Sequence, residues 1–217
     1  MAQYGKADYW EDRYQKDKES FDFYQRYEHI RNLLNEYIPS KRATILQLGC
    51  GNSKLAEDMC NNGYLIIQNV DISFHVIKQM QEYYKEKPGY QSLSFKQMDV
   101  KSLQYEDASI DFVVDKACFD AILCSENAIE GAETMLREVS RVLKSGGVYI
   151  SISYGIPDNR MIYFGGKDYN WTVGVHKIIK PQIPEDELDE DEGRRFHYMY
   201  VMKKLWISKI YNINKFK

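Results

Sequence analysis

Gly49 and Gly51 stand two positions apart, directly after the apolar run TILQL, in the segment TILQLGCGNS. Glycine has no side chain, so a turn that contains it can pass close beneath a bound ligand. An acid, Asp71, ends the next apolar run, LIIQNVD, about 20 residues later. In nucleotide-binding α/β units, an acid at this position accepts hydrogen bonds from the ribose hydroxyls. The residue types and their spacing therefore predict a nucleoside site.

The residue that follows the glycine turn argues against a dinucleotide. A GxGxxG fingerprint needs a third glycine so that the helix can pack under a pyrophosphate. Lys54 stands at that position, in GCGNSK. An NAD-dependent dehydrogenase is therefore the least favoured of the nucleoside-binding enzymes.

Two more acids follow apolar segments: Asp99 in FKQMDV and Asp115 in IDFVVD. Carboxyl ends of parallel strands meet at one edge of a sheet, so we expect Asp71, Asp99 and Asp115 to face one crevice. Such a crevice suits S-adenosylmethionine, which is cationic at its sulfur and amine and carries no phosphate. Asp71 would hold the ribose, Asp99 and the Val100 amide would meet the adenine, and Lys116 would pair with the methionine carboxylate. The alternative for each acid alone is that it caps a helix or a turn.

Strands and helices alternate around these residues. The expected strands are 44–48, 65–70, 92–98, 110–115 and 148–154, and the expected helices are 53–61, about 73–85 and about 128–143. Two helical stretches, 8–17 and 24–37, come before them, and Gly146-Gly147 is expected to end the long helix. Repeated strand–helix–strand units force parallel pairing with right-handed crossovers.

The last part of the chain breaks this alternation. Segments 169–178 and 196–205 are both rich in β-forming residues, and no helix is expected between them, so they should pair antiparallel. The expected fold class is therefore α/β, a doubly wound, seven-stranded, mostly parallel Rossmann-like sheet of the methyltransferase type with an antiparallel terminal hairpin.

Composition limits the classes of protein. The 217 residues suit one domain, and the net charge of −3 gives no general reason to expect nucleic acid or an anionic membrane as partner. The amino terminus lacks the apolar core of a signal peptide, and no apolar run is long enough to span a bilayer. The four cysteines and four histidines are scattered, so we expect reduced thiols in a cytoplasmic protein, no metal site and a monomer.

Several segments resemble the class I S-adenosylmethionine-dependent methyltransferases, namely LQLGCGNSKLAEDM, NVDISFHVIKQM, MDVKSL and FVVDKACFDAIL. Within that class the chain is similar to the group that includes the elongation factor 1A lysine methyltransferases. That group shares a YWxxRY signature, here YWEDRY at 9–14, a short aromatic segment, here FDFY at 21–24, and LGCGNS in the glycine loop. The resemblance runs from about Tyr9 to Leu205. We expect one methyltransferase domain over 1–217, with a helical lid at 1–40, a core at 41–205 and a tail at 206–217.

The resemblance implies which residues bind the cofactor. Three aromatic residues of the lid would close over it: Trp10, Tyr14 and Phe23. The residues that would line its site are Gly49, Gly51, Asp71, Ile72, Asp99, Val100 and Lys116. The alternative for the aromatic residues is that they only pack the first helix of the chain onto the sheet. The chain departs from the group at Ala117-Cys118-Phe119, where Gly-Thr-Leu is usual, and at Phe23, where tryptophan is common. The first departure lies at the wall nearest the reacting methyl, so the acceptor is less well defined than the cofactor.

A lysine acceptor must lose its proton before methyl transfer, and a buried slot lowers its pKa. The candidates for a catalytic base are Asp115, Asp120 and Tyr154, which lie at or just past the ends of the fourth and fifth strands; each could instead be structural. The chain lacks the [ND]PP[YFW] motif of adenine-N6 and glutamine methyltransferases, and has DKAC there instead.

The favoured function is S-adenosylmethionine-dependent methylation of a protein lysine, with a substrate like elongation factor 1A. The alternatives are a small-molecule methyltransferase and a non-catalytic module that binds the cofactor. The acidic run EDELDEDE at 185–192 is either a solvated loop or an attractor for a basic protein surface. The sequence does not decide the structure of the basic tail from 206 to 217.

Overall fold

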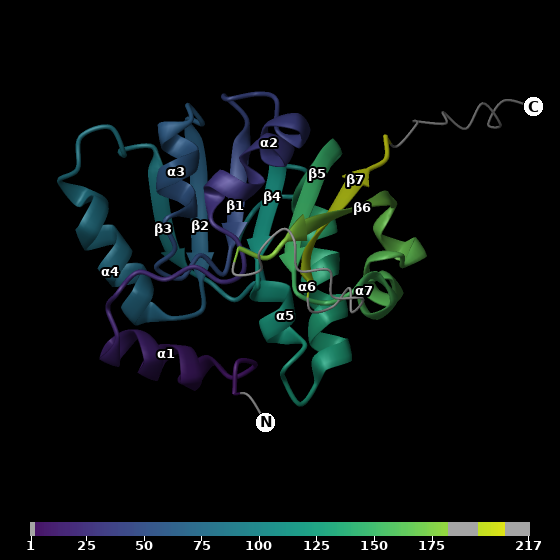
Figure 1. Ribbon diagram of the computed structural model, residues 1–217, viewed down its shortest axis with the longest axis horizontal. Coiled ribbons are helices and arrows are strands. Elements are labelled where there is room, and N and C mark those ends of the chain that lie inside the picture. Colours follow the sequence, from purple (N-terminus) through teal and green to yellow (C-terminus); the bar gives the residue numbers. More distant parts are fainter. Residues whose placement is uncertain (1–2, 182–194, 207–217) are drawn as a thin grey trace, which may run out of the picture.

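The computed structural model describes residues 3–181 and 195–206 of the chain (Figure 1). The acidic run at 185–192 and all of the tail after residue 206 lie outside the described residues. No helix in the described part of the chain is both long and apolar enough to cross a membrane.

The described strands form one seven-stranded sheet in the order β3-β2-β1-β4-β5-β7-β6. Their bounds are Thr44–Leu48 (β1), Ile66–Asp71 (β2), Leu93–Gln97 (β3), Ile110–Lys116 (β4), Leu143–Ser153 (β5), Trp171–Ile179 (β6) and Phe196–Lys204 (β7). Strands β1 to β5 pair parallel, and β7 pairs antiparallel with both β5 and β6. The predicted fold class, including the terminal hairpin, is confirmed.

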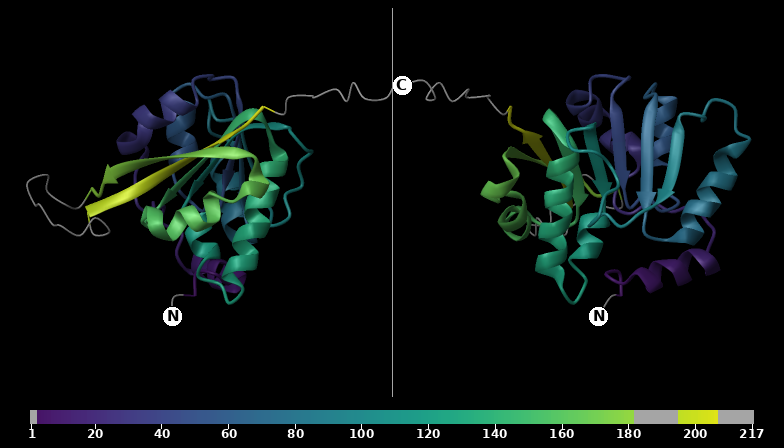
Figure 2. Two further views of the ribbon diagram at one scale, coloured as in Figure 1. Left: turned by 90° about the vertical axis from the view of Figure 1, so that its right-hand side faces the viewer. Right: turned by 180° about the vertical axis from the view of Figure 1, so that it is seen from behind.

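The helices lie on both faces of this sheet and across one of its edges. They are α1 (Ala7–Lys16), α2 (Tyr27–Tyr37), α3 (Leu55–Asn61), α4 (Phe74–Lys85), α5 (Cys118–Ile122), α6 (Ala128–Val142), α7 (Pro157–Phe164) and the 3₁₀ turn η1 (Lys167–Tyr169). Figures 1 and 2 show α1 across the carboxyl edge of the parallel strands, outside the two helical layers. The lid segment therefore lies where parallel sheets bind ligands.

Two apolar cores, one on each face, hold the helices to the sheet. Ile45 of β1 belongs to the core under α2, α3 and α4, whereas its neighbour Leu46 belongs to the core under α6 and α7. This is the two-residue alternation of a strand that is covered on both sides. The covering explains why the parallel strands read as continuous apolar runs.

Several helices and strands begin or end at residues other than the predicted ones. Helix α2 begins at Tyr27 and not at residue 24, because Tyr24 has a φ of 65°, which an α-helix cannot contain. Strand β5 begins at Leu143, directly after α6, so Gly146-Gly147 lies inside the strand and does not end the helix. The β4–β5 register shifts there, from Ile110↔Leu143 to Phe112↔Val148, which marks an irregularity that Gly146, with a φ of 78°, accommodates.

Candidate active site

The ten residues expected to bind the cofactor all line one pocket at the carboxyl edge of the sheet. They are Trp10, Tyr14, Phe23, Gly49, Gly51, Asp71, Ile72, Asp99, Val100 and Lys116. The pocket holds about 900 Å³, counting the open space at its mouth. It adjoins the ends of β1 and β4, the two strands between which the strand order reverses.

The floor of the pocket is the glycine turn after β1. Gly49 and Gly51 have φ values of 57° and 51°, in the left-handed region that side chains disfavour. A Cβ on Gly49 would lie 2.6 Å from the Cβ of Cys118, and one on Gly51 would meet the hydroxyl oxygen of Tyr14. Both glycines are therefore required by conformation and by space, and the cradle they leave suits a flat ligand such as a nucleoside.

Asp71 is tied to the glycine turn. Its Oδ2 accepts a hydrogen bond from the Gly51 amide at 2.8 Å, and its Oδ1 accepts one from the Ser73 amide at 3.0 Å. Burial raises its pKa above the ordinary value, while these amide hydrogen bonds act in the opposite direction. Each carboxylate oxygen has a second lone pair, so the group can still accept hydrogen bonds from a ribose.

Lys116 ends β4 inside the pocket and pairs with an acid that the sequence interpretation did not single out. Its ammonium lies 2.8 Å from Asp22 Oδ1 and donates to the Phe23 carbonyl at 3.1 Å. The Ser53 hydroxyl donates to the same oxygen of Asp22. Burial lowers the pKa of Lys116, although Asp22 opposes this effect. These contacts use two of the three N–H donors of the ammonium.

Aromatic rings form the roof of the pocket. The Trp10 ring stacks on Tyr4 at 5.7 Å and on Tyr14 at 5.9 Å between centroids, and Phe21 meets Phe23 at 5.1 Å. All five side chains also line the pocket. The rings pack against one another and cover the site at once, so the lid and packing interpretations of this segment are compatible. Such faces are favourable neighbours for a cation.

Asp115 does not face the pocket, and the expectation that three acids share the crevice is wrong for this one. It is fully buried; Oδ1 accepts from the amide of Cys118 at 2.7 Å, and Oδ2 accepts from the Ser151 hydroxyl at 2.8 Å. Burial raises its pKa to about 7. Successive residues of a strand point to opposite faces, so with Lys116 in the pocket Asp115 must lie behind it. There it holds the start of α5.

Asp120 and Tyr154 lie beside the pocket and do not line it. Asp120 Oδ1 accepts from the Ser153 hydroxyl at 2.6 Å and from Arg160 Nη2 at 2.8 Å. Its Oδ2 accepts from the Tyr24 hydroxyl at 2.9 Å and from the Tyr154 amide at 3.1 Å. The side chain of Tyr154 itself is half exposed. Sequence interpretation missed Arg160, because the eight-residue α7 was not predicted, and mentioned Tyr24 only within the aromatic segment.

No group of three or more His, Cys, Asp or Glu side chains that could hold a metal ion occurs within residues 3–181 and 195–206.

The chain is similar to known proteins over most of its length. The family model described as a methyltransferase domain matches residues 39–216. The chain is 36% identical over 198 residues to the eEF1A lysine and N-terminal methyltransferase of Bos taurus, an alignment that covers 88% of this chain and 27% of that protein. It is 34% identical over 182 residues to the EEF1A lysine methyltransferase 4 of Mus musculus, covering 79% of this chain and 69% of that one. The chain thus spans about a quarter of the first relative and about two thirds of the second.

A solved structure of a SAM-dependent methyltransferase from Methanosarcina mazei has the same fold. It aligns with a TM-score of 0.61 at 18% identity and covers 85% of this chain and 99% of that one. At this identity the likeness concerns the fold alone. The family match and the second relative carry the assignment: the chain belongs to the methyltransferase-domain family, as a class I S-adenosylmethionine-dependent methyltransferase related to these eEF1A methyltransferases.

Proposed function

We propose that this chain transfers a methyl group from S-adenosyl-L-methionine to a lysine side chain of a protein, and that elongation factor 1A is its substrate. The observation that carries the proposal is the pocket in which Asp71, tied to the glycine turn, faces a roof of aromatic rings. Both relatives are eEF1A lysine methyltransferases by name, which supports a lysine acceptor. Because the chain spans only part of those relatives, the activity and substrate are proposed for it and not carried over.

The residues of the pocket fit this cofactor. We assign Asp71 to the ribose hydroxyls, Asp99 and the Val100 amide to the adenine, and Lys116 to the carboxylate of the methionine part. Trp10, Tyr14 and Phe23 would cover it from the lid. When bound, the cofactor supplies a methyl group activated by a positively charged sulfur. Asp71 and Asp99 bring negative charge to a ligand that has no phosphate.

The roof also supports the chemistry. Methyl transfer is an in-line displacement, so positioning and the exclusion of water account for most of the catalysis. The rings of Tyr4 and Trp10 pack edge to face with Phe23, and all three line the pocket, so they bring apolar surface to it. A lysine amine that enters such a site favours its neutral form, which is the form that can accept a methyl group.

We further propose that residues 1–217 act as one domain with 1–40 as its lid, in the cytoplasm, as a monomer that binds neither nucleic acid nor membrane. The net charge of −3 supports the absence of nucleic-acid and membrane binding, and the scattered cysteines support the cytoplasmic location.

Labelled S-adenosylmethionine, incubated with the chain and a cell extract, tests the class of acceptor. We expect label in a protein band at the mass of elongation factor 1A. Label in a small-molecule product other than the cofactor, with none in protein, would favour a metabolite acceptor instead. Binding of the cofactor without any transfer would favour a non-catalytic module.

A further inference from the structure

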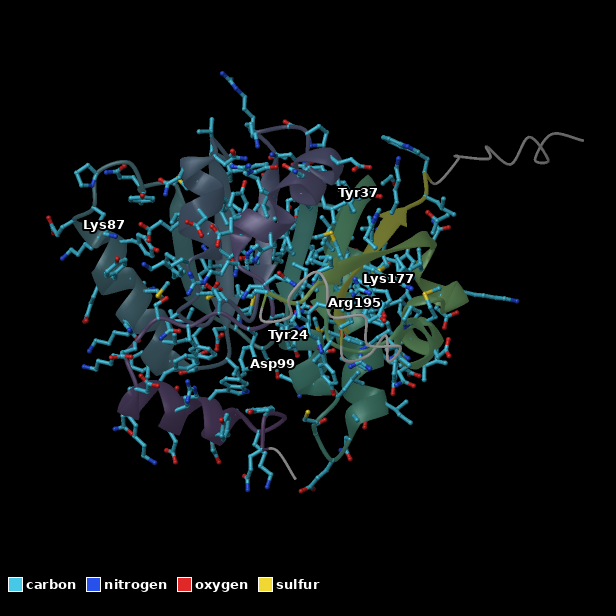
Figure 3. All side chains as sticks on the ribbon, in the orientation of Figure 1. Tyr24, Tyr37, Lys87, Asp99, Lys177 and Arg195 are labelled. Atoms are coloured by element: carbon cyan, nitrogen blue, oxygen red, sulfur yellow. The ribbon has the colours of Figure 1, made fainter. Side chains whose placement is uncertain are left out.

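Tyr24 lies between the cofactor pocket and the protein surface. Its ring centroid is 5.8 Å from that of Phe23, which lines the pocket, and 6.0 Å from that of the half-exposed Tyr154. Figure 3 shows Tyr24 and Asp99 labelled beneath the centre of the sheet, at its carboxyl edge. The three rings therefore form a continuous aromatic cluster between the surface and the pocket wall.

The hydrogen bond of Tyr24 has a defined direction. Its hydroxyl donates to Asp120 Oδ2 at 2.9 Å. Asp120 is held in turn by Arg160 and Ser153, both of which donate to Oδ1. Burial and the nearby Asp120 raise the pKa of Tyr24, so the phenol keeps its proton. The lone pairs of its oxygen are then available to accept a hydrogen bond from another group.

The backbone at this position carries strain. Tyr24 has a φ of 65°, and Ala117, which precedes the helix that carries Asp120, has a φ of 74°. Left-handed conformations are disfavoured for residues with a side chain, and they cluster at functional sites. Tyr24 makes the hydrogen bond to Asp120, and Ala117 directly precedes α5, the helix that carries Asp120.

We propose that the hydroxyl oxygen of Tyr24 accepts a hydrogen bond from the amine of the acceptor lysine. Asp120 and Arg160 are positioning residues that act through Tyr24. The assignment rests on the proposed function, because it needs a primary amine as acceptor.

This geometry suits the transfer step. The amine gives up a proton to water before it enters, and one of its two N–H bonds is then directed to Tyr24. Its lone pair is left to form the new N–C bond, while the C–S bond breaks and its electron pair stays on sulfur. The methylated ammonium product releases its extra proton to water, which completes the balance.

The test compares two ligands by isothermal titration calorimetry, and neither needs a protein substrate. One is S-adenosylhomocysteine, and the other is an analogue with an aminoethyl arm on the atom that replaces sulfur, so that a primary amine stands where the acceptor nitrogen would lie. For Tyr24→Phe we expect unchanged affinity for S-adenosylhomocysteine and about tenfold weaker binding of the amine analogue. The matched control is Tyr90→Phe, which removes a hydroxyl that donates to Asn61 at 2.8 Å on the exposed surface, and it should bind both ligands as the wild type does.

The ratio of the two affinities decides the outcome. An unchanged ratio in Tyr24→Phe, whether both ligands bind normally or both bind weakly, overturns the proposal. If the wild-type chain methylates no elongation factor 1A, the proposed function fails, yet the calorimetric ratio still reports on the amine site. With an active protein acceptor, Tyr24→Phe should also lower kcat and leave the KM of the cofactor unchanged.

Discussion

The carboxylate of Glu11 on α1 accepts a hydrogen bond from the backbone amide of Phe74, the first residue of α4, at 3.2 Å. It also accepts from the His75 amide at 3.3 Å and from the Ser73 hydroxyl. An acid at a helix N-terminus satisfies free amides and opposes the positive end of the helix dipole. Glu11 therefore ties the helix that carries Trp10 and Tyr14 to the segment just after Asp71.

Glu11→Gln should weaken binding of S-adenosylhomocysteine by about three- to tenfold, because the loss of charge loosens α1 over the pocket. Asp12→Asn is the matched control, since this neighbouring acid is exposed and pairs only with Lys16 on its own helix among the described contacts. Calorimetry measures both variants. Equal affinities for Glu11→Gln and the control would mean that the contact does not hold the lid.

Gly51→Ala should abolish or strongly weaken cofactor binding, because a Cβ there meets the Tyr14 hydroxyl. Gly63→Ala separates this clash from backbone strain, since Gly63 also has a positive φ, of 91°, and a Cβ there meets nothing within 4 Å. Backbone strain should cost both variants about 1 kcal/mol of unfolding free energy in a urea titration, and the clash should cost Gly51→Ala more. Only Gly51→Ala should lose affinity, and a matching loss in Gly63→Ala would contradict the steric argument.

Lys116→Met should weaken binding of S-adenosylhomocysteine by at least about tenfold and leave binding of adenosine almost unchanged. The reason is that only the first ligand carries the carboxylate assigned to this lysine. Calorimetry with both ligands checks the assignment. A similar loss for adenosine would show that Lys116 acts by holding Asp22 and the loop around it.

The buried carboxyl group of Asp115 should make the free energy of unfolding depend on pH. Its pKa is raised by burial to about 7 in the folded chain, against 3.8 ordinarily, so the folded state holds the proton more tightly than the unfolded state. Its contribution to the free energy of unfolding is full below about pH 4 and is lost as the pH rises to about 7. In urea titrations, the wild type should lose on the order of 3 kcal/mol more than Asp115→Asn over this range. If the free energies of unfolding of the wild type and Asp115→Asn changed in parallel with pH, the raised pKa of Asp115 would be refuted.

The gathering of Gly49, Asp71 and Asp99 in one pocket could be predicted because these residues follow strand ends, and parallel strands bring those ends together. Gly49, Asp71 and Asp99 needed only their order along the chain. The orientation of Asp115 could not be predicted in this way. A strand covered on both faces is apolar throughout, so its pattern does not show which residue faces the pocket.

The remaining residues of the site lie in segments whose sequence has no periodic pattern. Asp22 and Tyr24 lie in an irregular segment whose path over the sheet is set by long-range contacts such as those to Lys116 and Asp120. Arg160 lies on a helix of eight residues, too short for a helical pattern to stand out. The missed residues are those that become neighbours only after folding.

We propose that this chain methylates a lysine of elongation factor 1A. The most direct test of this proposal is mass spectrometry of purified elongation factor 1A after incubation with the chain and S-adenosyl-L-methionine. We expect new methyl groups on a lysine that depend on the cofactor and disappear with Gly51→Ala. Complete absence of new methyl-lysine with the wild-type chain, under conditions where S-adenosylhomocysteine binds, would contradict it.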